Sequence, residues 1–457
     1  MHPLVVLNVV GLTPELIGPH TPNIARLAVH GALRNLRTVT PAVTCSAQAT
    51  FLTGLPPSDH GAVANGWLFR DLSEVWLWRQ SNRLLAGERV WDAGRARDPR
   101  FTCANMFWWY NMASSADFAV TPRPIYKADG RKIPDCYAQP GALRDELTRK
   151  LGAFPLFQFW GPATSVRSSR WIADAALHVL ETRDPTLTLV YLPHLDYVLQ
   201  RLGPDDPGIA DDLAEIDAVA GSLIRAAHAA GRRVMVLSEY GIVPVSTPVH
   251  INRALREAGL LAIRTEEGGE LLDAPQSRAF AVADHQIAHV YVADAADVPR
   301  VRALLEDLDG VAEVWGEKEK RQNGLDHPRS GELVALARAD AWFTYYYWLD
   351  DRRAPDFARC VDIHRKPGYD PVEMFLDPAL RFPKLSVGWR LMKKALGLRT
   401  LMDVIPLDAT LVRGSHGRAD TPDERGPVLI SSEPDLMPPG PIDAVRVKQL
   451  MLDHIFS

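Results

Sequence analysis

A threonine hydroxyl at the start of a predicted helix is the first group in this chain whose position suggests chemistry. Thr44 follows the segment Thr40-Pro41-Ala42-Val43, and a helical pattern begins near Cys45-Ser46 and ends at Gly54. The free N–H groups and positive dipole end of a helix N-terminus favour an anion, so a hydroxyl there suits phosphate binding or transfer. The alternative interpretation of Thr44 is an ordinary helix N-cap.

Two carboxylates and one histidine are candidate metal ligands. Asp196 follows a predicted strand at residues 187–192, Glu239 ends the next strand at 233–238, and His416 lies in a loop before the last strand. The carboxyl ends of parallel strands meet at one sheet edge, so these side chains can converge on a divalent cation. Taken singly, each is also typical of a cap, an ion pair or a surface loop.

The elements that position these residues alternate between buried strands and amphipathic helices. Apolar runs predict strands at residues 4–9, 187–192, 233–238 and 427–431, and helices at 21–31, 45–54, 170–182, 212–230 and from 443 onward. This alternation predicts an α/β fold with a doubly wound, mostly parallel sheet.

The middle of the chain has a different pattern. Short strands at 288–292, 311–315 and 331–336, with a helix at 297–308, predict a β-α-β-β insertion, and residues 341–400 are predicted to be irregular. We therefore expect a catalytic core formed by residues 1–258 and 401–457, with residues 259–400 as an inserted α+β cap.

Composition excludes several classes of protein. The chain has 457 residues, 51 basic and 56 acidic, with a net charge of −5, which argues against a dedicated binder of nucleic acid or of an anionic membrane. Apolar stretches are too short for a membrane-spanning helix, and the first residues do not resemble a signal peptide. Four scattered cysteines favour a reduced interior, so we expect a cytoplasmic, globular protein without membrane insertion.

The order of these segments resembles the alkaline phosphatase superfamily, and within it the type I phosphodiesterase/nucleotide pyrophosphatase branch. The resemblance is strongest in Thr40–Thr44, in Thr53-Gly54-Leu55-Pro56-Pro57-Ser58-Asp59-His60-Gly61 and at Asn65. It continues in Tyr191–Asp196, Ser238-Glu239-Tyr240-Gly241 and Ser415-His416-Gly417. It implies Thr44 as the nucleophile, Asn65 as a donor to phosphoryl oxygens, and zinc ions held by Asp196, Glu239 and His416.

Three positions depart from the family pattern of metal ligands. Val10 stands where the family has Asp, Gln200 where it has His, and Tyr240 where it has the His of an Asp-His pair. The substitutes that we considered are Asp284 with His285, Asp362 with His364, and His194, which would share a face with Asp196 along an extended backbone. An oxygen-rich site formed by Asp196, Glu239 and Thr44 would suit Mg²⁺ or Mn²⁺ better than Zn²⁺, and it is compatible with fewer than two ions.

Aromatic and basic residues suggest how a substrate is bound. Trp67 and Phe69 follow Asn65 directly and are candidates for a pocket that takes a flat or apolar substituent, and Arg70, Arg79 and Lys366 are candidate partners of phosphate charge.

Two functions from different classes remain. The first is a metal-dependent hydrolase of a small phosphodiester, phosphomonoester or phosphonate that acts through Thr44. The second is a non-hydrolytic member that binds a phosphorylated or aromatic small molecule as a scaffold or carrier. A phosphate-transferring mutase lacks support, because no serine nucleophile of that pattern is present.

Overall fold

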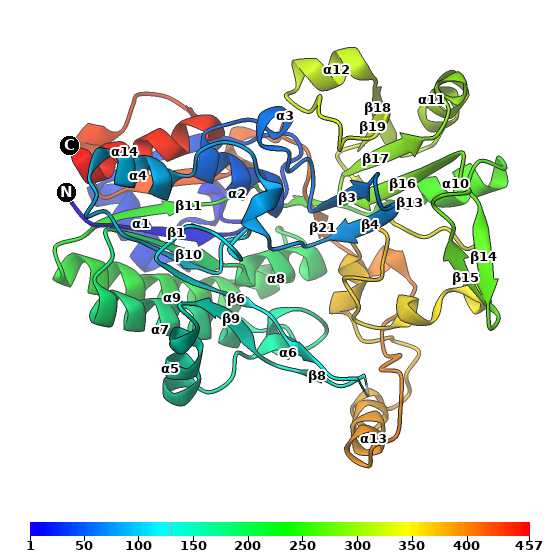
Figure 1. Ribbon diagram of the computed structural model, residues 1–457, viewed down its shortest axis with the longest axis horizontal. Helices are drawn as coiled ribbons and strands as arrows, with labels where there is room; N and C mark the ends of the chain where they lie inside the picture. The colour runs from blue at the N-terminus through cyan, green and yellow to red at the C-terminus, as the bar shows by residue number, and fades with distance from the viewer. Residues whose placement is uncertain (129) are drawn as a thin grey trace.

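A nine-stranded sheet forms the centre of the molecule in this computed structural model, which describes residues 1–128 and 130–457 (Figure 1). In spatial order its strands are β23 (Ile442–Asp443), β2 (Ala32–Arg37), β22 (Val428–Ser431), β11 (Arg233–Leu237), β1 (Leu4–Val9), β10 (Leu187–Leu192), β5 (Cys103–Met106), β6 (Phe118–Pro122) and β9 (Cys136–Gln139). The run from β11 to β6 is parallel, whereas β22 and β9 are antiparallel to their inner neighbours.

Helices cover both faces of this sheet, which explains why its middle strands are continuously apolar. Every residue of β1 and β10 is buried. Figure 1 shows α7 (Val166–Arg183) and α9 (Ala210–Ala229) on one side, and α2 (Thr44–Thr53), α4 (Val90–Arg97) and α14 (Val447–Phe456) on the other. The remaining helices of this part are α1 (Pro22–His30), α3 (Pro57–His60), α5 (Gly141–Leu151), α6 (Leu156–Phe159) and α8 (His194–Leu202). The predicted α/β class with a mostly parallel sheet is therefore confirmed.

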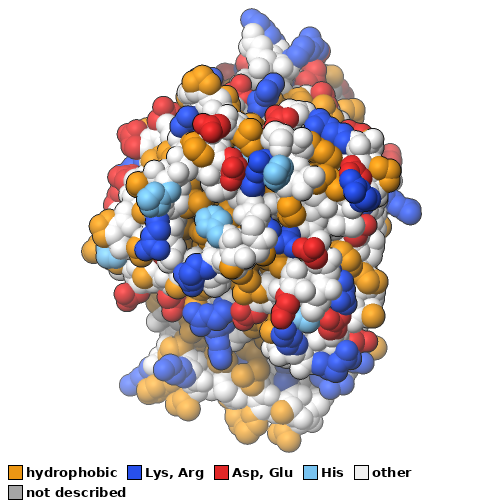
Figure 2. All heavy atoms as spheres, turned by 90° about the vertical axis from the view of Figure 1, so that its left-hand side faces the viewer, with side chains coloured by type: hydrophobic (Ala, Val, Ile, Leu, Met, Phe, Trp, Pro, Cys, Tyr) orange, Lys and Arg blue, Asp and Glu red, His pale blue; other side chains and the backbone are white. Residues whose placement is uncertain are grey.

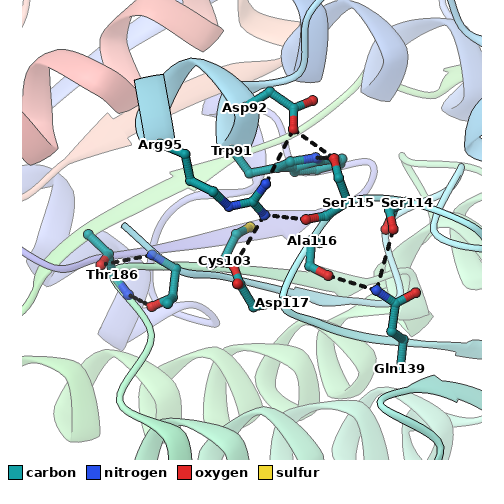
Figure 3. Close-up of polar contacts among 11 residues, drawn as sticks. Trp91, Asp92, Arg95, Cys103, Ser114, Ser115, Ala116, Asp117, Gln139 and Thr186 are labelled. Carbon is teal, nitrogen blue, oxygen red and sulfur yellow. Dashed lines mark hydrogen bonds and ion pairs between the residues drawn. The ribbon is translucent and has the colours of Figure 1, made fainter. Parts of the chain in front are cut away.

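A polar network ties α4 to the β5–β6 edge of the sheet (Figure 3). Arg95 forms ion pairs with Asp92 at 3.4 Å and Asp117 at 3.3 Å, and it also donates to the carbonyl of Ser115. Asp117 in turn accepts the backbone N–H of Cys103 at 2.8 Å. These contacts hold α4 against the strand ends, and they anchor the start of the aromatic segment that follows β5.

A second, four-stranded antiparallel sheet follows the order β16 (Ala279–Asp284), β17 (Ile287–Val292), β19 (Leu333–Ala337) and β18 (Val311–Trp315). Its helices are α10 (Ile251–Glu257), α11 (Val298–Glu306) and α12 (Glu317–Gln322). Its core is a separate apolar cluster that also includes Val63 and Trp67. The predicted β-α-β-β unit is present, but β16 precedes it and was missed.

Ten short strands of two to four residues form five pairs that complete the described strands. They are β3 (Gly66–Phe69) with β4 (Glu74–Leu77), β7 (Ile125–Tyr126) with β8 (Lys132–Ile133), β12 (Val243–Pro244) with β21 (Gly414–Ser415), β13 (Thr247–Val249) with β20 (Ala341–Phe343), and β14 (Ile263–Glu266) with β15 (Gly269–Leu272).

The segment 341–400 is less irregular than expected. It contains a 13-residue helix, α13 (Pro383–Ala395), whose Pro383 stands in the first turn, where proline is tolerated. The segment predicted as irregular therefore contains a helix that its prolines and charges concealed. Across the described residues, no helix combines the length and the apolar character that crossing a bilayer requires.

Candidate active site

Polar residues gather where the parallel strands of the central sheet end. Asp196 lies in the first turn of α8, directly after β10, and Glu239 and Tyr240 follow β11. Thr44 is the first residue of α2, and all four side chains are buried. Residues from distant parts of the sequence thus meet at one sheet edge, as expected for an α/β fold.

The Thr44 hydroxyl is linked to a carboxylate through a phenol. Tyr240 Oη donates to Asp196 Oδ1 at 3.1 Å, and Thr44 Oγ1 lies 3.1 Å from the same phenol oxygen. Because the single phenol hydrogen is used on Asp196, Thr44 is the donor to Tyr240. Burial raises the pKa of Asp196 to about 7, against hydrogen bonds from Gln200 and Tyr240 that lower it. The result is a hydrogen-bonded chain from a hydroxyl to a basic carboxylate.

Glu239 is held by amides. Its Oε1 accepts hydrogen bonds from Asn8 Nδ2 and Gln48 Nε2, both at 2.5 Å. Gln48 is four residues after Thr44 on α2, so the two side chains share a helix face. Burial raises the pKa of Glu239 to about 7, and these two hydrogen bonds lower it only in part. Neutral amide donors therefore bind one oxygen of the carboxylate that the family resemblance assigned to a cation, and its Oε2 has no hydrogen-bond partner in the described part of the chain.

Asn65 and Asp284 join the two sheets. Asp284, at the end of β16, accepts from the Asn65 backbone N–H at 2.7 Å and from Asn65 Nδ2 at 3.0 Å. Asn65 Oδ1 accepts from the backbone N–H of Cys45 at 3.0 Å. One of the two amide hydrogens of Asn65 is thus engaged by Asp284, and the other is left for a ligand.

Two histidine rings are stacked beside this chain. His285 and His416 have ring centroids 3.7 Å apart, and Tyr240 stacks on His416 at 3.6 Å. His285 Nδ1 donates to Asp284 at 2.8 Å and His416 Nδ1 donates to the carbonyl of Ala42 at 2.8 Å. Burial lowers the pKa of both imidazoles well below the usual value, so both are neutral at neutral pH. Each Nε2 therefore carries a lone pair, and neither has a hydrogen-bond partner in the described part of the chain.

The family resemblance implies a metal centre, and some of these side chains offer ligand atoms for one. His416 Nε2 lies 3.7 Å from Asp196 Oδ1, a separation that one shared ion can bridge with bonds of about 2 Å. A second ion lacks ligands, because Val10 offers none and Asn8 and Gln48 already donate to Glu239 Oε1, which leaves only Glu239 Oε2 without a partner among the described residues. The residues fit one ion between Asp196 and His416, and they do not fit two.

Other predicted ligands lie elsewhere. In residues 1–128 and 130–457, ligand atoms of three His, Cys, Asp or Glu residues come within 4.8 Å of one another only at His194, Asp212 and Glu215. His194 begins α8 instead of continuing a strand, so it does not share a face with Asp196, and its Nε2 lies 2.8 Å from Asp212 Oδ1. The expectation that His194 faces the same side as Asp196 was wrong for that reason.

A cavity of about 2310 Å³ opens above these residues. Five of them line it and form what we call the polar floor: Thr44, Asp196, Tyr240, His285 and His416. Aromatic rings continue the lining in an arc of neighbours 5.1 to 6.0 Å apart: Trp109, Trp78, Tyr369, Trp160 and Tyr197. A cavity with a polar end and aromatic walls suits an amphipathic small molecule.

The charge of the cavity lining is strongly unbalanced. Among the described residues, eight Lys or Arg and only two carboxylates, Asp196 and Asp362, line it. The basic residues are Arg79, Arg123, Arg131, Lys132, Arg365, Lys384, Lys394 and Arg399. A lining of this composition attracts an anionic ligand.

The remaining predicted residues are divided between the cavity and the packed interior. Phe69, Asp362 and His364 line the cavity, and the backbone N–H of Asp362 donates to Glu373 at 2.9 Å. Trp67 is buried, with Arg329 over its ring. Among the basic candidates, Arg79 lines the cavity, Arg70 pairs with Glu332, and Lys366 is buried between Asp370 and Glu373.

Sequence reasoning missed Gln48, Asn8, Tyr369 and the positive role of Tyr240. Gln48 had a detectable signal, since a glutamine in a helix that is otherwise small and apolar, four residues after Thr44, must find a buried partner. Tyr240 was treated only as the loss of a histidine.

The central α/β sheet, the hydroxyl at a helix N-terminus and the acidic residues at the strand ends agree with the resemblance to the alkaline phosphatase superfamily. Residues 4–370 match the family of type I phosphodiesterases and nucleotide pyrophosphatases, and the chain belongs to that family.

Solved structures share this fold at low sequence identity. Murine ectonucleotide pyrophosphatase/phosphodiesterase 5, in an inactive form in complex with AMP, has a TM-score of 0.60 and 13% identity, covering 100% of this chain and 95% of that chain. Its human counterpart gives the same values. Phosphonoacetate hydrolase from Sinorhizobium meliloti, in complex with phosphonoformate, has a TM-score of 0.60 and 14% identity, covering 99% and 96%. The comparison with curated proteins found no significant match.

Proposed function

We propose that this protein hydrolyses a small phosphoric ester or phosphonate that carries a large apolar or aromatic group, with Thr44 as the nucleophile. The observation that carries the proposal is the Thr44–Tyr240–Asp196 chain at the polar end of a cationic, aromatic cavity. The two ligand-bound relatives, one with AMP and one with phosphonoformate, support a small phosphorylated ligand.

In the proposed reaction, Thr44 Oγ1 attacks phosphorus and the bond from phosphorus to the leaving group breaks. The hydroxyl proton moves to Tyr240 Oη as the phenol proton moves to Asp196, so the carboxylate acts as the base through one intermediate group. The N-terminus of α2 and the free amide hydrogen of Asn65 stabilise the phosphoryl oxygens. Water then hydrolyses the phosphoryl-threonine and restores the hydroxyl.

Asp196 and His416 are the residues that would hold a divalent ion. A bound ion at that position supplies Lewis-acid stabilisation of phosphoryl oxygens. The family resemblance favours Zn²⁺, and Mg²⁺ or Mn²⁺ remain alternatives because of the carboxylate and hydroxyl oxygens.

The second candidate is binding without hydrolysis, and one observation favours it. Asn8 and Gln48 both donate to Glu239 Oε1, and Asp284 engages the amide of Asn65. A pocket in which these groups are already paired can hold a phosphorylated ligand without turning it over.

The test combines metal analysis with turnover. Purified protein is analysed for bound metal and assayed with bis-p-nitrophenyl phosphate and p-nitrophenyl phenylphosphonate, with and without added Zn²⁺, Mg²⁺ or Mn²⁺. Hydrolysis that falls at least about a thousandfold in Thr44→Ala and survives in Thr44→Ser supports the nucleophile. Calorimetric binding of AMP or a phosphonate without any Thr44-dependent turnover would establish the second candidate instead.

A further inference from the structure

One segment of the surface is both apolar and basic. Residues 381–402 contain Arg381, Lys384, Arg390, Lys393, Lys394 and Arg399 and no Asp or Glu, in a protein whose net charge is −5. We call residues 381–402 the outer segment. It includes α13, which Figure 1 shows at the lower end of the molecule, away from both sheets.

The apolar residues of the outer segment are exposed. Leu385 is 71% exposed, Trp389 55% and Leu396 72%. Eight of the seventeen large hydrophobic side chains that are exposed among the described residues fall between positions 382 and 401. Figure 2 shows the lower end of the molecule, where this segment lies, covered with hydrophobic and basic side chains. A contiguous exposed apolar patch of this kind marks an interaction surface.

Helical spacing separates two faces of α13. Leu385, Trp389, Met392 and Leu396 follow the i, i+4, i+7, i+11 spacing and form one outward stripe. Residues on another face of the same turns line the cavity, namely Lys384, Val387, Gly388, Leu391, Lys394 and Ala395. The helix therefore closes the cavity with one face and presents an unpartnered apolar stripe with the other.

The cations flank this stripe and are mostly unneutralised. Arg390 pairs with Asp403, but no ion pair is found for Lys384, Lys393, Lys394 or Arg399 with any described residue. Lys393 lies 5.3 Å from the ring centroid of Trp389, so its charge sits at the edge of the stripe. Apolar side chains flanked by long basic ones are the composition of a helix that lies in a membrane interface.

The β7–β8 hairpin extends the same surface. Tyr126 is 59% exposed and Ile125 38%, and both Tyr126 and Lys132 line the cavity that α13 also lines. Lys132 stacks over Tyr126 at 5.9 Å. Two separate parts of the chain thus present aromatic and basic groups around one cavity.

We propose that the outer segment docks onto the surface of an anionic lipid bilayer, with α13 parallel to the membrane plane. A 13-residue helix is about 20 Å long, so it lies in the interface and does not span the bilayer. The cations contact lipid phosphates while the stripe enters the boundary with the acyl chains. A second copy of the chain is a poor occupant, because six cations would face six cations. Nucleic acid would leave the apolar stripe without a partner.

The docking is tested with full-length protein and sedimented vesicles. Vesicles of phosphatidylcholine alone are compared with vesicles containing about 30% phosphatidylglycerol, at low and high salt. We expect binding to the anionic vesicles, weakened by salt, and at least about tenfold weaker binding in the triple variant Leu385→Ser, Trp389→Ser, Leu396→Ser. The matched control replaces three equally exposed apolar residues elsewhere, Val29→Ser, Leu72→Ser and Leu349→Ser, and keeps wild-type binding.

A charge variant provides a second, independent measurement. Lys393→Glu with Lys394→Glu should also weaken binding about tenfold or more and reduce its salt dependence. The proposal is overturned if anionic vesicles bind no better than neutral ones, or if the triple variant binds like the control. It is equally overturned if light scattering shows a dimer that the stripe variant dissociates, which would assign the stripe to a second copy. None of these measurements depends on hydrolysis.

Discussion

The polar floor and the outer segment line the same cavity but differ in how their charged groups are paired and exposed. At the polar floor, Asp196 accepts hydrogen bonds from Tyr240 and Gln200, and the nearby Glu239 accepts from two amides. In the outer segment, basic side chains and large apolar ones lie together in the open.

The difference follows from the dielectric surroundings. A buried carboxylate without a partner costs several kcal/mol, so the floor must satisfy its charges internally or through a bound ligand. An exposed lysine is solvated by water and needs no partner, but an exposed tryptophan or leucine gains from burial by an external surface. The carboxylate of the floor is therefore paired within the protein, while Nε2 of His285 and of His416 has no partner among the described residues, and the apolar side chains of the outer segment are exposed to solvent.

The largest expected effect comes from a glycine next to the polar floor. A Cβ on Gly241, directly after Tyr240, would lie 1.6 Å from the Arg425 carbonyl oxygen. Gly241→Ala is expected to lower the free energy of unfolding by at least about 3 kcal/mol, since backbone on both sides must move. Chemical denaturation measures this loss. An unchanged stability would show that the floor is looser than its contacts indicate.

Removing one oxygen from the floor should have the next largest effect. Tyr240→Phe deletes the link between Thr44 and Asp196 while keeping the ring on His416. We expect kcat to fall about a hundredfold with little change in KM, because the hydroxyl loses its route to a base. Tyr347→Phe is the matched control, since its phenol is also buried and donates to the Glu270 carbonyl at 3.2 Å but lies outside the cavity lining. Equal losses in both variants would contradict the relay.

A smaller effect is expected in the pH dependence of stability in metal-free buffer. The folded-state pKa of Glu239 is raised to about 7, so the folded protein holds a proton that the unfolded chain has already lost. This contribution is complete below about pH 4 and is lost as the pH rises through 7. Between pH 6 and 8, one such group removes about 1.4 kcal/mol from the free energy of unfolding.

The matched variant is Glu239→Gln, which cannot titrate. Urea unfolding at pH 6 and pH 8 with a chelator should show a drop that is smaller by about 1.4 kcal/mol in the variant than in the wild type. An identical drop in both proteins would mean that Glu239 is ionised across this range.

The smallest effect belongs to the outer segment. Gly388 lies inside α13, and apart from the helix's own adjacent backbone and neighbouring residues no described atom lies within 4 Å of the position that a Cβ would occupy. Gly388→Ala should stabilise the helix by about 0.5–1 kcal/mol through lower entropy of the unfolded chain. Hydrogen exchange of the α13 amides measures this directly. Destabilisation would mean that α13 is packed as tightly as the floor.

Much of the central sheet was predictable because its signals are local. The strands at 4–9 and 187–192 coincide with β1 and β10, since continuous apolar runs between helices suit only buried parallel strands. The helix at 383–395 was missed because residues 341–400 as a whole are rich in proline, aromatic residues and charge, which made the segment look irregular. The net charge of −5 also does not reveal the outer segment, because it averages six local cations with the acidic residues of the rest of the chain.

The sequence alone determined the class of fold, the family and the nomination of Thr44, Asp196 and His416, because these rest on residue types at short spacings. Only the tertiary structure decided that Tyr240 joins Thr44 to Asp196, although both lie far from it in the sequence. The tertiary structure likewise decided that two amides bind one oxygen of Glu239. It also decided that one face of α13 closes the cavity while the other is exposed. The physical reason is that hydrogen-bond partners and exposed faces depend on which strand ends and helices meet in space, and no local pattern encodes that meeting.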